Sequence, residues 1–210
     1  VAENTSAAYH EEDNSIRTDN IPRYYQMRLK TKDALTQYVT FEKLIQDPVG
    51  NLTVIYEEMK SDYEKCVYEF NHTRFQTVNA KERFKDALEN YQHEIGRFRK
   101  GIDQIEYRDF VKKAFVYMNK TFMTKLDGEH RQISGWRLFQ IVFIVSLICE
   151  MIRSEYKNDP NIAEADIETA NLLYFPTGGG KTEAFLGACV FNMFFDRLRG
   201  KNDGITAFLK

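Results

Sequence analysis

The first half of the chain carries apolar residues at helical spacing. Between residues 52 and 70 they recur at alternating steps of four and three, and the same spacing returns between residues 84 and 105. The two runs are Leu52, Tyr56, Met59, Tyr63, Cys66 and Phe70, then Phe84, Leu88, Tyr91, Ile95, Phe98, Ile102 and Ile105. This period places one apolar stripe along each helix. It predicts two long helices in an antiparallel hairpin with a turn at 77–80, covered by a third helix at 110–123.

The remainder of the chain has a different pattern of apolar and polar residues. The sequence before residue 47 has no clear apolar period, residues 47–51 read Asp-Pro-Val-Gly-Asn, which is typical of a turn, and the sequence from residue 135 onward is apolar. The expected regions are an irregular, mobile N-terminal segment at 1–50, a helical accessory domain at 51–125, a polar linker at 126–134 and the first part of an α/β domain at 135–210.

A glycine-rich segment carries the clearest chemistry. The apolar run 171–175 suits a buried strand, residues 176–182 read Pro-Thr-Gly-Gly-Gly-Lys-Thr, residues 183–198 suit a helix, and 205–209 suit a second strand. Strand, glycine loop and helix in this order are typical of a βαβ unit that binds phosphate. Glycines let phosphate oxygens reach backbone N–H groups, and the helix N-terminus adds partial positive charge.

The side chains of this loop have distinct expected roles. Lys181, the predicted catalytic residue, supplies charge to the β and γ phosphates, and the Thr182 hydroxyl is placed to bind Mg²⁺. ATP and Mg²⁺ are therefore the expected cofactors. The loop departs from the pattern G-x-x-x-x-G-K-[ST] at its first position, which is Phe175. With two upstream residues, the expected cofactor-binding set is Arg137, Gln140, Thr177, Gly178, Gly179, Gly180, Lys181, Thr182 and Glu183.

Charge and cysteine usage restrict the function classes. The net charge of −2 is near neutral, but basic residues outnumber acidic ones two to one between 97 and 137. Such a stretch can face a phosphate backbone or form solvated helix faces, and we leave both open. The three cysteines are widely separated in apolar surroundings, which favours reduced thiols and the cytoplasm. No secretory signal is visible, and the apolar run 139–152 is short for a membrane span.

Two segments resemble a known family. Residues 136–140 read Trp-Arg-Leu-Phe-Gln, and residues 172–187 read Leu-Leu-Tyr-Phe-Pro-Thr-Gly-Gly-Gly-Lys-Thr-Glu-Ala-Phe-Leu-Gly. They resemble superfamily 2 helicases, in particular the large helicase subunit of the bacterial DISARM phage-defence system and its relatives. Arg137 and Gln140 match the Arg-x-x-Gln element that many of these enzymes use to read adenine, and the Gln140 amide can both donate and accept. The alternative is a surface glutamine at a helix start.

The resemblance covers residues 92–210, because residues 95–102 and 114–119 are also similar to the region that precedes the motor in that branch. It carries expectations of its own. It implies a helical N-terminal region followed by the start of a RecA-like α/β P-loop domain, truncated within its first lobe. The complete protein is then a cytoplasmic ATPase that moves on nucleic acid, with DNA as the expected track and a partner subunit of a defence complex. The acidic Mg²⁺ motif and the second-lobe arginine are expected beyond Lys210. We therefore expect this segment to be inactive in hydrolysis alone.

Two other readings remain open. One is a P-loop protein of another class, such as a small kinase or a signalling NTPase, although the Arg-x-x-Gln element and the Thr-Glu-Ala sequence after Lys181 speak against it. The other is a helical interaction module with an assembly role, which nothing before residue 134 excludes. A metal enzyme is poorly supported because the four histidines are scattered.

Overall fold

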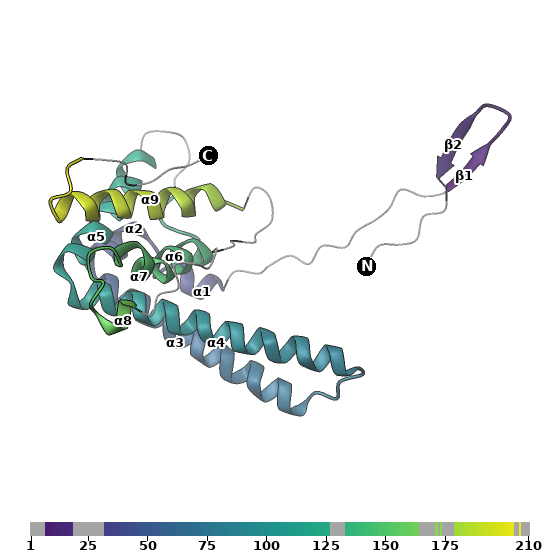
Figure 1. The fold of residues 1–210 in the computed structure, drawn as a ribbon, viewed down its shortest axis with the longest axis horizontal. Coiled ribbons are helices and arrows are strands. Elements are labelled where there is room, and N and C mark those ends of the chain that lie inside the picture. Colours follow the sequence, from purple (N-terminus) through teal and green to yellow (C-terminus); the bar gives the residue numbers. More distant parts are fainter. Residues whose placement is uncertain are drawn as a thin grey trace. The chain divides into compact units, whose positions relative to one another are not determined.

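The computed structural model describes residues 7–18, 32–126, 133–163, 171, 173, 179–203 and 206. The chain divides into two compact units, residues 1–32 and 33–210. In the first unit, β1 (Ala7–His10) and β2 (Ser15–Thr18) form an antiparallel hairpin in which Ala7 lies opposite Thr18 (Figure 1). The Tyr9 hydroxyl donates a hydrogen bond of 2.6 Å to Oδ1 of Asn14 across the turn.

The second unit begins with two short helices, α1 (Asp33–Thr36) and α2 (Phe41–Gln46). Phe41 and Leu44 of α2 are buried in the core. Here the structure differs from the irregular segment expected for residues 1–50, because residues 33–36, 41–46 and 48–50 are helical.

The expected turn at 47–51 is instead the start of a helix. The Asp47 side chain accepts a hydrogen bond of 2.9 Å from the N–H of Gly50, and Pro48 occupies the first helical position. Both features favour helix initiation, since aspartate caps free N–H groups and proline has no N–H to lose there.

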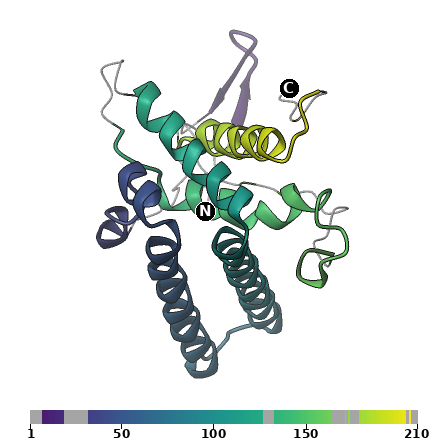
Figure 2. The same cartoon turned by 90° about the vertical axis from the view of Figure 1, so that its left-hand side faces the viewer.

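The predicted helical hairpin is present. α3 (Pro48–His72) and α4 (Val78–Tyr107) pack side by side and antiparallel (Figures 1 and 2). The connection is residues 73–77 and not 77–80, because Thr77 caps α4 by accepting from the N–H of Ala80 at 3.1 Å. Aromatic pairs join the two helices along the predicted stripes, with ring centroids 6.1 Å apart for Tyr63 and Tyr91 and 5.6 Å for Phe70 and Phe84.

The base of the hairpin enters a helical body. This body contains α5 (Asp109–Leu126), α6 (Leu138–Ser146), α7 (Ile148–Ile152), α8 (Pro160–Ala163) and α9 (Lys181–Leu198). α9 packs on both α5 and α6, and α4 packs on α6 (Figure 2). Gly101 of α4 lies against the backbone of Val145, so this helix pair approaches more closely than any larger side chain allows. The most deeply buried side chains of this core include Phe98, Ile102, Ile105, Phe115, Met118, Ile141, Ile144, Phe191 and Phe195.

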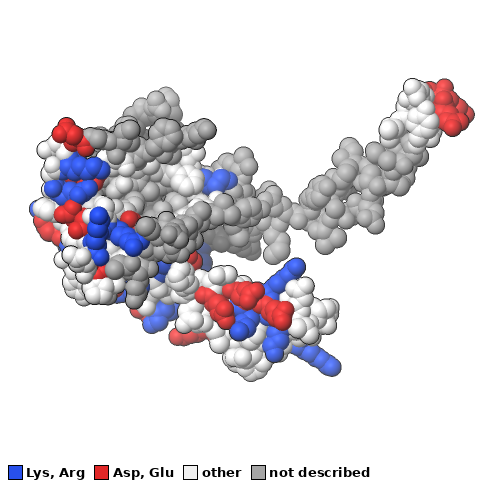
Figure 3. Space-filling view, in the orientation of Figure 1, with Lys and Arg blue, Asp and Glu red and all other residues white. Residues whose placement is uncertain are grey.

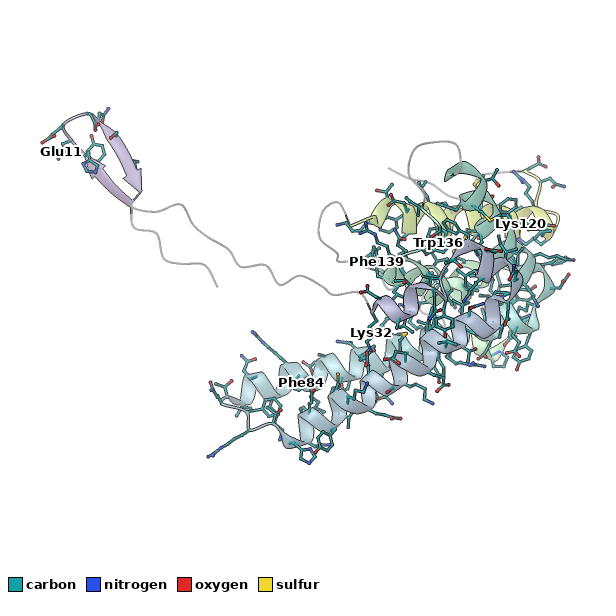
Figure 4. All side chains as sticks on the ribbon, turned by 180° about the vertical axis from the view of Figure 1, so that it is seen from behind. Glu11, Lys32, Phe84, Lys120, Trp136 and Phe139 are labelled. Carbon is teal, nitrogen blue, oxygen red and sulfur yellow. The ribbon has the colours of Figure 1, made fainter. Side chains whose placement is uncertain are left out.

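Trp136 is the anchor of the segment that leads into α6. Its ring lies 5.4 Å from that of Phe41 and 4.4 Å from that of Phe122, and its Nε1 donates to Oδ1 of Asn119 at 2.8 Å. Its backbone N–H donates to the carbonyl oxygen of Val39 at 3.0 Å. Figure 4 shows Trp136 among the closely packed side chains of the body.

In the C-terminal part, the structure describes the helices of the predicted α/β domain but not its strands. From residue 133 onward, the elements that the structure describes are α6 to α9, while the strands expected at 171–175 and 205–209 lie largely outside the described residues. The fold shown is therefore mostly helical, and the start of a RecA-like lobe stays a prediction.

Two further features bear on the expectations about cysteines and membranes. Cys66, Cys149 and Cys189 are free thiols, and burial raises the pKa of Cys149 to about 11. Within the described residues, no helix is both long and apolar enough to cross a bilayer.

Candidate nucleotide-phosphate site

The described end of the glycine loop joins α9 without a break. Gly180 is the N-cap of α9 and adopts a left-handed backbone conformation with φ 86° and ψ 31°, which glycine reaches at no steric cost. A Cβ at this position would lie 2.7 Å from Nε2 of Gln140. Both the backbone conformation and the available space therefore require glycine. The helix begins at Lys181, two residues before the predicted start.

Two side chains of the α6 N-terminus hold the loop through its carbonyl groups. Arg137 Nη1 donates to the oxygen of Gly179 at 2.8 Å, and Gln140 Nε2 donates to the oxygen of Gly180 at 2.7 Å. The C=O and N–H of a trans peptide plane point in opposite directions. Anchoring these two oxygens to α6 therefore turns the N–H groups of Gly180 and Lys181 away from α6. Consecutive N–H groups at a helix N-terminus are the donors that an anion requires.

The position of α6 relative to α9 follows from local packing. Trp136 fixes the residue before Arg137, so the start of α6 is tied to the aromatic core. A Cβ on Gly187 of α9 would lie 2.5 Å from Cδ1 of Ile144 and 2.9 Å from Cη2 of Trp136. The glycine thus lets α9 lie directly on α6, and this contact brings the glycine loop within reach of Gln140.

The structure gives Gln140 a contact that the sequence did not predict. Its side chain is 5% exposed, its Oε1 accepts from the backbone N–H of Arg137 at 2.8 Å, and its Nε2 faces Gly180. In this conformation the amide is engaged within the protein, and reading adenine would require it to leave the loop. The adenine-reading role stays a prediction. The one available sequence signal is the i, i+3 spacing of a helix N-cap and a glutamine.

The other predicted site residues lie on the first turn of α9. Lys181 is half-buried, whereas Thr182 and Glu183 are exposed. Thr177 and Gly178 lie outside the described residues. In the part of the chain that the structure describes, no group of three or more His, Cys, Asp or Glu side chains could hold a metal ion. Mg²⁺ binding through Thr182 stays a prediction.

The opposite end of α9 is fixed by a buried carboxylate. Asp196 is 4% exposed and accepts hydrogen bonds from Arg199 Nε at 2.9 Å, Lys201 Nζ at 2.8 Å and Thr206 Oγ1 at 2.9 Å. Burial by itself raises the pKa of Asp196, but the hydrogen bonds from Lys201, Arg199 and Thr206 outweigh it and set the pKa below its ordinary value. Asp196 therefore stays ionised at neutral pH and ties the segment after α9 to the helix.

The basic stretch at 97–113 is mostly neutralised by ion pairs. Arg97 is the most enclosed: it bonds Glu94 at 3.0 Å, and its Nη2 bonds both Glu150 and Asn171 at 2.8 Å. Arg99 pairs with Asp103 at 2.7 Å, Arg108 pairs with Asp159, and Lys113 pairs with Asp109 at 2.6 Å. Arg97 therefore links α4 to α7 and to the residue that begins the expected strand. Of the two readings left open for this stretch, these pairs favour solvated helix faces with ion pairs.

Comparisons with known proteins support one part of the predicted relationship. The chain is 30% identical over 157 residues to the DISARM protein DrmA of Bacillus paralicheniformis. The alignment covers 63% of this chain and 13% of that relative. A scan against protein-family models found no match. The chain thus has a distant similarity to a DISARM protein and spans about an eighth of its length.

Proposed function

We propose that this chain is part of an ATP-driven nucleic-acid motor related to the DISARM phage-defence proteins, and that its glycine loop binds the phosphates of ATP. The observation that carries the proposal is the pair of hydrogen bonds from Arg137 and Gln140 to Gly179 and Gly180. These bonds fix the two described residues at the end of the loop, with two successive N–H groups turned to the same side. The similarity to DrmA supports the defence setting.

The residues present fit a nucleoside triphosphate. The N–H groups of Gly180 and Lys181 would donate to phosphate oxygens, and the partial positive charge of the α9 N-terminus adds to their attraction. The Lys181 ammonium would neutralise charge on the β and γ phosphates, and the Thr182 hydroxyl would ligate Mg²⁺. Mg²⁺ held at Thr182 would supply positive charge against the charge that develops on the phosphates during transfer. Arg137 and Gln140 would position the end of the loop before the nucleotide binds.

Hydrolysis needs groups beyond this site. A water-positioning carboxylate and an arginine that stabilises transition-state charge are required in motors of this kind. We propose that segments of the complete protein outside these 210 residues supply both, so the chain alone binds nucleotide and does not turn it over.

Nucleotide binding is tested with a fluorescent ATP analogue and Mg²⁺. We expect the unaltered chain to bind and Lys181→Ala to weaken binding by about 10- to 100-fold, the effect of losing one charged hydrogen-bond donor. Lys60→Ala is the matched control, since it removes an exposed lysine of α3, which carries no site residue. Equal affinity of Lys181→Ala and the unaltered chain would refute the proposal.

A further inference from the structure

Three basic side chains at the free end of the α3–α4 hairpin differ from the lysines along the rest of the hairpin because they have no carboxylate partner among the described residues. On the shaft, lysines pair with carboxylates one turn away, as Lys60 does with Glu57 at 3.4 Å and Lys65 with Asp62 at 3.5 Å. At the free end, Arg74, Lys81 and Arg83 are exposed and make no ion pair with any residue that the structure describes. Figure 3 shows Lys and Arg side chains projecting there, with Asp and Glu side chains close by.

The sequence at this end supplies few opposing charges. Residues 70–81 contain no aspartate or glutamate, the first turn of α4 contains no acidic residue, and Glu82 is the one carboxylate between Lys81 and Arg83. Lys81 and Arg83 nevertheless lie in the first two turns of α4, where the helix dipole disfavours cations and favours anions. The dipole of α4 therefore does not favour Lys81 at this position, where its exposed ammonium is open to an external anion.

The end of the hairpin is held in shape by aromatic packing. The rings of Phe70, Phe75 and Phe84 lie 5.4 to 5.9 Å from one another and join both helices to the connecting loop. Figure 4 shows Phe84 near this free end. Beside this cluster, Tyr68 is 64% exposed and stacks on His72 with centroids 3.9 Å apart. The cations are therefore displayed from a defined scaffold that also offers an exposed aromatic ring.

The hairpin carries this end away from the core. Counted from the tip, the first α4 residue that belongs to the core cluster is Phe98, and the 20 residues from there to Val78 correspond to about 30 Å of helix. That distance exceeds the Debye length of about 10 Å at 0.1 M salt, so charges of the body contribute little to the potential at the tip.

From these observations we propose that the hairpin tip, defined by Arg74, Lys81 and Arg83, binds the phosphate backbone of DNA. The contact is independent of base sequence, because unpaired cations on exposed side chains attract phosphates and read no base edge. It would give the motor a hold on its track outside the nucleotide site. The inference rests on the proposed function for its choice of DNA over another polyanion.

The test is fluorescence anisotropy of a labelled DNA duplex with the 210-residue chain at several salt concentrations. The tip variant is Arg74→Gln, Lys81→Gln and Arg83→Gln combined. The control variant, Lys60→Gln, Lys65→Gln and Lys113→Gln combined, changes the net charge equally but removes cations that are already paired.

We expect the tip variant to bind about 10- to 100-fold more weakly at 0.1 M salt, and its plot of log affinity against log salt to flatten by roughly 2 to 3. The control variant should lose less than about threefold, since its cations are screened by partners. Equal losses in both variants, or unchanged binding by the tip variant, would overturn the proposal, as would no DNA binding by the unaltered chain.

Binding of the fluorescent ATP analogue by the same variants separates this inference from the proposed function. Lost DNA binding with intact nucleotide binding in the tip variant supports the inference. Unchanged DNA binding with intact nucleotide binding in the tip variant would refute DNA binding by the hairpin tip and leave the proposed function standing. Failure of the unaltered chain to bind nucleotide sinks the proposed function, whatever the anisotropy shows.

Discussion

The two glycines of α4 predict opposite effects of the same substitution. A Cβ on Gly101 would lie 2.9 Å from both the carbonyl carbon and Cγ1 of Val145, and closer still to the carbonyl oxygen, where ordinary contacts begin at 3.4 Å. α4 and α6 would have to separate, and such overpacking costs about 1 to 3 kcal/mol. Gly96 has nothing within 4 Å of its Cβ position. Gly96→Ala therefore gains helix propensity without a clash, which stabilises the helix by about 0.5 to 1 kcal/mol.

The net effects follow by subtraction. Gly101→Ala gains the same propensity, about 0.75 kcal/mol at mid-range, but loses about 2 kcal/mol by the clash. We therefore expect it to destabilise the chain by about 1 kcal/mol, which lowers Tm by roughly 2 to 4 °C in a chain of this size. Gly96→Ala should raise Tm by roughly 1 to 4 °C. Because α6 carries Arg137 and Gln140, Gly101→Ala should also weaken nucleotide binding, whereas Gly96→Ala should leave it unchanged.

Thermal unfolding followed by circular dichroism at 222 nm measures both variants against the unaltered chain. The comparison is internal, because the two substitutions lie in one helix and add the same methyl group. If Gly101→Ala is as stable as Gly96→Ala, α4 and α6 do not approach closely at Gly101, and α4 does not fix the position of α6.

Two further predictions concern buried polar groups. Trp136→Phe leaves Oδ1 of Asn119 unpaired where that side chain is fully buried, and we expect a loss of about 1 to 3 kcal/mol in urea unfolding. A stability equal to that of the unaltered chain would refute the role of this hydrogen bond. Asp196→Asn removes a carboxylate whose folded pKa is lowered, so its contribution of about 1 to 3 kcal/mol is present above pH 4 and is lost as pH falls through the folded pKa. The stability difference measured at pH 7 should therefore shrink toward pH 3, and a difference that grows on acidification would contradict this sign.

The long helices could be predicted from the sequence because their apolar positions repeat at a regular spacing. The stripes of α3 and α4 repeat over five or more positions, so both helices and their pairing could be read from residues such as Tyr63 and Tyr91. Short helices give no such signal, and α2 with its buried Phe41 was missed. Asp47-Pro48 is compatible with a turn and with a capped helix, and only the partner of the carboxylate distinguishes the two.

The candidate site was predictable in its residue types and not in its contacts. The glycine loop and Lys181 follow from local sequence, whereas the bond from Gln140 to Gly180 joins residues 40 positions apart. Such a bond depends on Gly187 bringing α9 onto α6. The charge count alone could not decide between the two readings of Arg97 for a related reason, since its partner Glu150 lies 53 positions away on another helix.

The most direct test of the account is calorimetric titration of ATP, GTP and inorganic tripolyphosphate, each with Mg²⁺, into the unaltered chain and Gln140→Ala. If Gln140 holds the glycine loop, the substitution should weaken all three ligands by a similar factor of about 3 to 10, the worth of one hydrogen bond. A loss confined to ATP would assign Gln140 to adenine instead. Binding of none of the three ligands by the unaltered chain would contradict the central claim that this loop is a phosphate site.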